Sequence, residues 1–151
     1  MGAPLRILSI EDSEDDALLI LRELRRGGYD PISTRVDTPE DMEAELDREP
    51  WDIVIADYVM PRFNGLEALK LMQGKGLDLP FILLSGKASE ETLIEAMKAG
   101  AHDYILKGNL SRLGPAVKRE LHEAAVRKEC KQAEKALRRS EETAMRIAQE
   151  N

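Results

Sequence analysis

Short apolar runs alternate along most of the chain with segments that carry helix signals. The runs are Leu5–Ile10, Ile32–Val36, Ile53–Ala56, Phe81–Leu84 and Tyr104–Leu106. Strands that alternate with helices form a parallel sheet through right-handed crossovers, and helices then cover both faces of that sheet. Ile53–Ala56 is wholly apolar, which is typical of a central strand buried on both faces. The sequence therefore predicts a doubly wound α/β fold with a five-stranded parallel sheet.

The intervening segments begin and end with the residues that favour helix termini. Ser13 precedes a pattern that places Leu18, Leu21 and Leu24 on one helix face, and Gly27 follows that pattern. The other helices are expected at 39–48, 66–73 and 89–99, with a last helix that starts at Leu110. Each predicted strand is thus followed by a predicted helix.

Polar side chains stand where four of the predicted strands end. Glu11 and Asp12 follow the first strand, Asp57 the third, Ser85 the fourth and Lys107 the fifth. In open α/β sheets, ligands bind outside the carboxyl ends of the strands. We therefore expect these five side chains to form one site at that edge of the sheet.

The residue types at this edge suit phosphate chemistry with a divalent metal. Carboxylates at Glu11, Asp12 and Asp57 would repel one another unless a cation neutralises them. Oxygen ligands without His or Cys favour Mg²⁺, which keeps several waters that a phosphate can replace. An aspartate can attack phosphorus as a nucleophile, and Asp57 is central in the trio. Lys107 would then contact the phosphoryl oxygens, and Ser85 would add a hydrogen bond.

Composition excludes several other classes of protein. The chain has 151 residues and a net charge of −7, which fits one acidic domain with an appendage and gives no basic surface for nucleic acid. The lone cysteine, Cys130, cannot form an internal disulfide, and His102 and His122 lack zinc-site spacing. With neither a membrane-spanning run nor a signal peptide, the chain is expected in the cytoplasm.

Four motifs at these strand ends resemble the receiver domain of bacterial two-component systems. They are Glu11-Asp12, the run Asp57-Tyr-Val-Met-Pro with Gly65 beyond it, Ser85-Gly86, and Ala-Gly-Ala-His-Asp-Tyr-Ile-Leu-Lys107. The match covers roughly residues 5–125, and the order, spacing and strand-end placement of the motifs all agree. The resemblance implies the flavodoxin-like fold with strand order 2-1-3-4-5.

The resemblance also implies roles for individual residues. Asp57 would accept a phosphoryl group from a histidine kinase or phosphotransfer partner. Asp12, Asp57 and the Val59 backbone carbonyl would bind Mg²⁺, with Glu11 acting through water. The protein would be no enzyme in the usual sense, since it would catalyse only its own phosphoryl transfer and dephosphorylation.

A switch would follow from phosphorylation in the same family. Ser85 and Tyr104 match the pair in which the hydroxyl moves toward the phosphoryl group and the aromatic ring turns inward. The fourth helix, fifth strand and fifth helix would form the output face. The alternative is a pseudo-receiver, an interaction domain that works without phosphorylation, and Mg²⁺-dependent phosphorylation separates the two.

Four positions limit how far the family pattern carries over. Glu11 stands where Asp is commoner, and its extra methylene affects metal geometry. Gly108 follows Lys107 where Pro is usual, so no cis peptide is expected there. Val59 and Lys87 occupy positions that tune access of water to the phosphoryl group, and neither orients water well. We expect slow decay of the phosphorylated form.

The C-terminal segment is expected to be a long helix without Pro or Gly. A receiver domain at 1–125 would lead into an extended helix or linker at 126–151, toward an output module outside this sequence. Small or apolar residues recur there with heptad spacing at Val126, Cys130, Ala133, Leu137, Ser140, Ala144 and Ile147. This weak seam fits either a coiled coil in a homodimer or a single helix, and the output face offers a second dimer surface.

Overall fold

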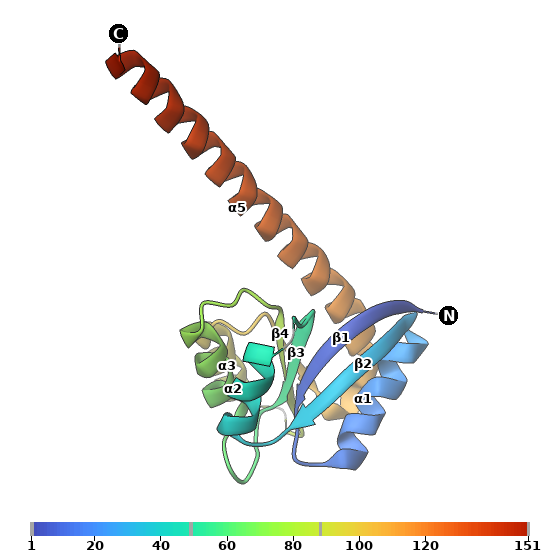
Figure 1. Cartoon of the computed structure of the whole chain (residues 1–151). Helices are drawn as coiled ribbons and strands as arrows, with labels where there is room; N and C mark the ends of the chain where they lie inside the picture. The colour runs from blue at the N-terminus through green and yellow to red at the C-terminus, as the bar shows by residue number, and fades with distance from the viewer. Residues whose placement is uncertain (1, 49, 88, 151) are drawn as a thin grey trace. The chain divides into compact units, whose positions relative to one another are not determined.

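The computed structural model describes residues 2–48, 50–87 and 89–150. The elements are β1 (Ala3–Ile10), α1 (Glu14–Arg26), β2 (Tyr29–Val36), α2 (Pro39–Arg48), β3 (Ile53–Asp57), α3 (Gly65–Gly74), β4 (Phe81–Ser85), α4 (Glu90–Ala99), β5 (Asp103–Leu106), the 3-10 helix η1 (Lys107–Arg112) and α5 (Leu113–Glu150). The strands form one parallel sheet in the order β2-β1-β3-β4-β5 (Figure 1). The predicted fold class and strand order are confirmed.

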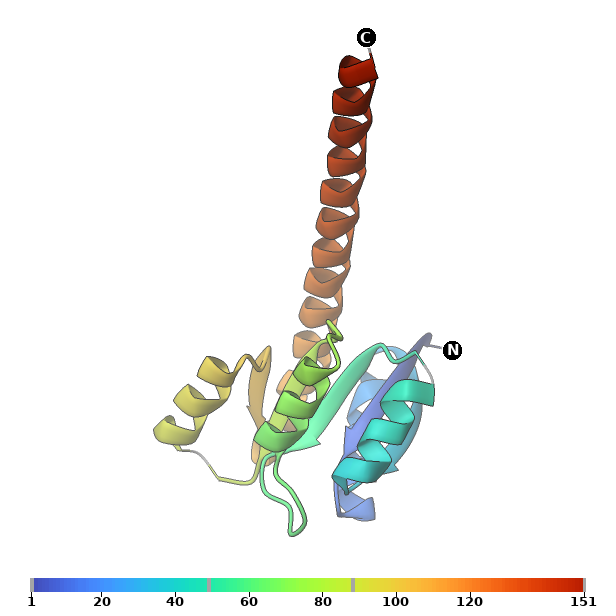
Figure 2. The ribbon, with the colours of Figure 1, turned by 60° about the vertical axis from the view of Figure 1, so that its left-hand side comes forward.

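Apolar side chains pack against both faces of this sheet. On one face, Met42 of α2, Leu69 of α3 and Ala96 of α4 belong to a single buried cluster. On the other face, Leu24 of α1 and Val117 near the start of α5 belong to a second cluster. Figure 2 shows α2 (cyan), α3 (green) and α4 (yellow) in a row in front of the sheet. Because β3 and β4 are buried along their whole lengths, they fix the polar residues at their carboxyl ends.

The buried face of α1 differs from the predicted one. Ala17, Ile20 and Leu24 are buried, whereas Leu18 is 55% exposed and Leu21 is only partly buried. Ala17, Ile20 and Leu24 also have helical spacing, so the sequence contains two overlapping apolar faces that could pack against the sheet. The small Ala17 thus takes the buried position in the first turns of α1, and the bulkier Leu18 is turned to solvent.

The last helix also begins later than predicted. Residues Lys107–Arg112 form the 3-10 helix, in which Asn109 has a non-helical backbone, and α5 starts at Leu113 rather than Leu110. Gly108 and Asn109 are weak helix formers, which explains the delay. From Leu113 the helix continues to Glu150 as expected.

The chain divides into two compact units, one up to Leu121 and one from His122 onward. In the second unit the residues of the heptad seam are all exposed. Across the part of the chain that the structure describes, no helix combines the length and hydrophobicity needed to cross a membrane.

Gly65 allows α3 to begin close to the end of β3. Its N–H donates a hydrogen bond to the Tyr58 carbonyl at 3.1 Å. A Cβ at this position would lie 2.7 Å from the Asp57 carbonyl oxygen and would also contact the Leu83 side chain. Only glycine therefore fits between α3 and the strand end that carries Asp57.

Replacing Gly65 by alanine is expected to lower the free energy of unfolding by about 1–3 kcal/mol, because the new methyl group overpacks a backbone contact. Urea denaturation measures this change. Gly74→Ala is the matched control in the same helix, since a Cβ there meets nothing within 4 Å. If both variants were equally stable, the close approach at Gly65 would not be a constraint on the fold.

Candidate phospho-acceptor site

The polar residues predicted to meet do gather at one edge of the sheet. Glu11 and Asp12 follow β1, Asp57 and Ser85 are the last residues of β3 and β4, and Lys107 directly follows β5. The loops after β1 and β3 turn back along the lower edge in Figure 1. This edge includes the point between β1 and β3 where the strand order reverses, which is where ligands bind in doubly wound sheets.

Three carboxylates form the centre of the site. One oxygen each from Glu11, Asp12 and Asp57 lies within 4.8 Å of the other two. Glu11 and Asp57 are buried at 1% and 6% exposure, while Asp12 is exposed. Burial of like charges this close is unfavourable without a cation. The set of ligand atoms, all oxygen, fits a hard divalent cation such as Mg²⁺.

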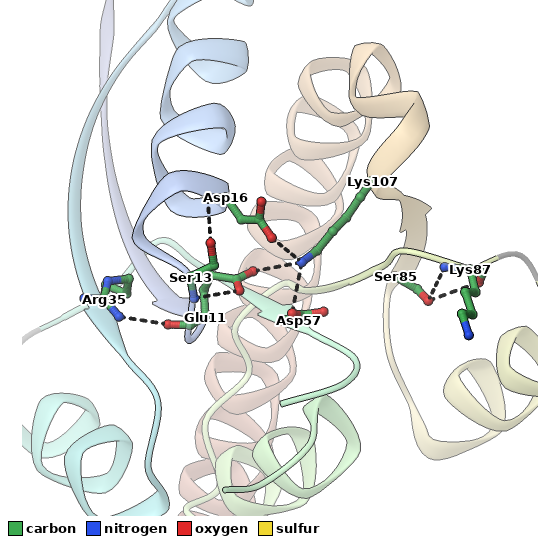
Figure 3. A network of polar contacts seen from close by, with 8 residues as sticks. All are labelled: Glu11, Ser13, Asp16, Arg35, Asp57, Ser85, Lys87 and Lys107. Atoms are coloured by element: carbon green, nitrogen blue, oxygen red, sulfur yellow. Dashed lines mark hydrogen bonds and ion pairs between the residues drawn. The ribbon is translucent and has the colours of Figure 1, made fainter. Parts of the chain in front are cut away.

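Lys107 supplies a positive charge within this cluster. Its Nζ lies 2.8 Å from Asp16 Oδ2, 3.0 Å from Asp57 Oδ2 and 3.3 Å from Glu11 Oε2 (Figure 3). Burial alone would lower the pKa of Lys107, but the hydrogen bonds to Asp16 and Asp57 and the charge of Glu11 outweigh it. The pKa of Lys107 therefore lies above its ordinary value, and the side chain stays charged.

Glu11 is the carboxyl group most affected by its surroundings. Its Oε1 accepts a hydrogen bond from the Ser13 N–H at 3.1 Å. Burial, more than any other cause, raises the pKa of Glu11 to about 7, and the charge of Asp57 adds to the rise. The Ser13 N–H and Lys107 act in the opposite direction without cancelling it. A cation in this site would favour the ionised form.

Ser85 is turned toward the loop that follows β4. Its hydroxyl donates to the Lys87 carbonyl at 3.1 Å and accepts from the Lys87 N–H at 3.3 Å. Figure 3 shows Ser85 and Lys87 on the side of the site away from Asp16. The hydroxyl is therefore committed to backbone groups in this structure.

Tyr104 lies in the interior and shares a partner with Ser85. It is 7% exposed, and its hydroxyl donates to the same Lys87 carbonyl at 3.3 Å. The Tyr104 hydroxyl also lies 3.1 Å from Thr92 Oγ1, and its ring meets the Tyr58 ring edge-on at 6.3 Å between centroids. The ring thus points inward, beneath the loop that Ser85 also contacts.

An open groove of about 450 Å³ runs from the acidic cluster toward α4. It is lined by Asp57, Tyr58, Val59, Ser85, Gly86, Lys87, Ser89, Thr92 and Lys107. Val59 is 72% exposed at this groove, so the residue two beyond Asp57 leaves the site accessible from solvent. A phosphoryl group is small enough to enter. The role of the Val59 carbonyl as a ligand stays a prediction.

Asp16 is a member of the site that the sequence did not reveal. It belongs to the first turn of α1, which is acidic at Glu14, Asp15 and Asp16 alike. Such acids are common at helix N-termini because they complement the helix dipole. Only the fold, which brings α1 next to the end of β5, distinguishes Asp16 from its neighbours.

The peptide bond between Lys107 and Gly108 is trans, as the sequence predicted, and no described peptide bond is cis.

The family profile described as "Response regulator receiver domain" matches residues 7–118. The chain is 31% identical over 114 residues to the chemotaxis protein CheY homolog of Campylobacter jejuni, covering 68% of this chain and 81% of that protein. It is 29% identical over 107 residues to the phosphate regulon transcriptional regulatory protein PhoB of Klebsiella pneumoniae, covering 68% of this chain but 44% of that protein. The chain thus spans less than half of PhoB.

Solved structures show the same fold. The signal receiver domain of a putative Luxo repressor protein from Vibrio parahaemolyticus matches with a TM-score of 0.73 and 23% identity, over 84% of this chain and 97% of that one. A CheY-like receiver domain protein from Methanospirillum hungatei matches with a TM-score of 0.68 and 25% identity, over 83% and 99%. Together with the profile match, this establishes that the chain belongs to the response regulator receiver domain family.

Proposed function

We propose that this chain is a phospho-acceptor signalling domain that takes a phosphoryl group on Asp57. The observation that carries the proposal is the setting of Asp57, which is buried beside two further carboxylates with Lys107 Nζ 3.0 Å from its Oδ2. An aspartate in such a setting can act as a nucleophile if the charge of the transferred group is neutralised. The family membership supports the same role.

The proposed reaction is one phosphoryl transfer. An Asp57 carboxylate oxygen forms a bond to phosphorus while the bond from phosphorus to the histidine nitrogen of a kinase or phosphotransfer protein breaks. Asp12, Asp57 and the Val59 carbonyl would hold Mg²⁺, with Glu11 acting through water, and the ion would supply charge neutralisation at the phosphoryl oxygens. Lys107 contacts those oxygens from the side of α1. The proposed setting of this exchange is the cytoplasm.

The proposed switch uses the contacts around Lys87. When the Ser85 hydroxyl turns to the phosphoryl group, it must leave the Lys87 backbone groups that it now contacts. The Tyr104 hydroxyl donates to the same Lys87 carbonyl, so a movement of Ser85 away from this carbonyl changes the hydrogen bonding of Tyr104. Tyr104 lies in β5, between α4 and α5, and we propose that this α4-β5-α5 face and the helix at 126–151 carry the output, with a homodimer as one form.

Incubation with acetyl phosphate is expected to add one phosphoryl group to the protein in the presence of Mg²⁺ and none in EDTA. The physical reason is that the carboxylate cluster repels an anionic donor until a cation neutralises it. Intact-mass spectrometry measures the adduct, and peptide mapping should assign it to Asp57. Absence of any adduct with Mg²⁺, or with beryllofluoride as a mimic, would favour a phosphorylation-independent interaction domain.

A further inference from the structure

Asp16 makes the shortest contact to Lys107 in the site. The distance from Lys107 Nζ to Asp16 Oδ2 is 2.8 Å, against 3.0 Å to Asp57 and 3.3 Å to Glu11. We infer that Asp16 is a positioning residue for Lys107, which holds the ammonium group toward α1 and so limits its competition with Mg²⁺ for Asp57 and Glu11. This inference rests on the proposed function and deepens it.

The Lys107 ammonium group is shared among three carboxylates. An ammonium group has three N–H donors, and three carboxylates lie within 3.3 Å of this one. Asp57 and Glu11 belong to the acidic cluster that fits a divalent cation, whereas Asp16 does not. An N–H that Lys107 directs to Asp16 is therefore not available to Asp57 or Glu11. Figure 3 shows the Lys107 ammonium group between Asp16 and the pair formed by Glu11 and Asp57.

The local backbone holds Asp16 in place for this contact. Its N–H donates to the Ser13 hydroxyl at 3.2 Å, which caps α1. The Asp16 side chain is 38% exposed, while the neighbouring Asp15 and Glu14 are exposed residues of the same turn. A general interaction with the helix dipole applies to all three acids and does not explain why one of them binds Lys107. The contact needs the particular place of Asp16.

Removing the Asp16 charge should let Lys107 shift fully onto the carboxylates of the metal site. The ammonium group would then offset more of the negative charge that attracts a divalent cation. Mg²⁺ affinity should fall, although Asp16 is no ligand itself. This fall in Mg²⁺ affinity requires Lys107. A direct loss of attraction between the Asp16 charge and the cation would not require it.

The test is a double-mutant cycle with Mg²⁺ affinity as the readout. Isothermal titration with MgCl₂ is made on the full chain as wild type, Asp16→Asn, Lys107→Met and the double variant. We expect Asp16→Asn alone to weaken Mg²⁺ binding about threefold to tenfold, a coupling of ordinary size for contacting charged residues. In the Lys107→Met background, the same substitution should change the affinity by less than about 1.5-fold.

Two further variants give the control and the rescue. Asp15→Asn removes a charge from the same turn without touching the Lys107 contact, and it should leave the affinity near that of the wild type. Asp16→Glu restores a carboxylate that can reach Lys107 and should recover most of the loss. Circular dichroism of each variant confirms that α1 remains folded.

The outcomes distinguish this inference from the proposed function. Asp16→Asn could instead weaken Mg²⁺ binding by the same factor in the wild-type and Lys107→Met backgrounds. The effect would then be a long-range electrostatic or a structural one, and the positioning role would be overturned. An unchanged affinity in the wild-type background would overturn it as well. A wild-type chain that binds no Mg²⁺ would overturn the proposed function, and the positioning role would fall with it.

Discussion

Asp57→Asn is expected to lose the phosphoryl adduct completely, from one group per chain to none. The amide has the shape of the carboxyl group but is a far weaker nucleophile toward phosphorus, and no other carboxylate of the cluster is the last residue of a buried strand. The change also removes one of the three charges that face Lys107. Intact-mass spectrometry after acetyl phosphate with Mg²⁺ measures the loss.

The matched control for this loss is Asp15→Asn, which removes an exposed carboxylate close to the site and should keep the full adduct. Asp57→Asn should remain folded, because Lys107 keeps Asp16 and Glu11 as partners. Circular dichroism and a cooperative urea transition verify this. An adduct that persisted in Asp57→Asn would place the acceptor on another residue and refute the assignment of Asp57.

The sequence predicted the site because its residues are tied to strand ends. β3 and β4 are buried along their whole lengths and apolar up to their last residues, so their registers are fixed, and Asp57 and Ser85 stand at their ends. Because the strands are parallel, their carboxyl ends meet at one edge whatever the lengths of the loops. The placement of Lys107 followed from the same rule.

The errors arose where several helical faces or several acids were equivalent in sequence. Leu18 and Ala17 lie on overlapping stripes of α1, and only packing against the sheet decides which stripe is buried. Asp16 has the same residue type and local setting as Asp15, and its contact with Lys107 spans 91 positions of sequence. Contacts between residues so far apart in the sequence leave no periodic pattern in it.

Glu11→Gln is expected to stabilise the metal-free protein at pH 8 by up to about 3 kcal/mol, because a shift of one pKa unit is worth about 1.4 kcal/mol. Burial raises the pKa of Glu11 to about 7 from 4.5. A carboxyl group whose folded pKa is raised favours the folded state below pH 4.5, and that contribution is lost as the pH rises through 7. Gln keeps the shape of the neutral side chain at every pH.

The gain in unfolding free energy of Glu11→Gln over the wild type should therefore increase with pH. In EDTA, urea denaturation should show it near its maximum at pH 8 and close to zero at pH 4.5. Glu14→Gln, which changes an exposed glutamate of α1, should alter stability by less than about 0.5 kcal/mol at either pH. A Glu11→Gln advantage that did not change between the two pH values would mean that ionisation of Glu11 is not its source.

Saturating Mg²⁺ should reverse the order of the two proteins at pH 8. A ligand that binds only the folded state adds to stability according to its affinity, and the wild type keeps the ionised Glu11 that favours a cation. The charge that destabilises the metal-free protein is thus the charge that attracts Mg²⁺. If Glu11→Gln remained the more stable protein in Mg²⁺, the contribution of Glu11 to metal binding would be smaller than the cost of its ionisation, and Asp12 and Asp57 would be the main carboxylate ligands of the cluster.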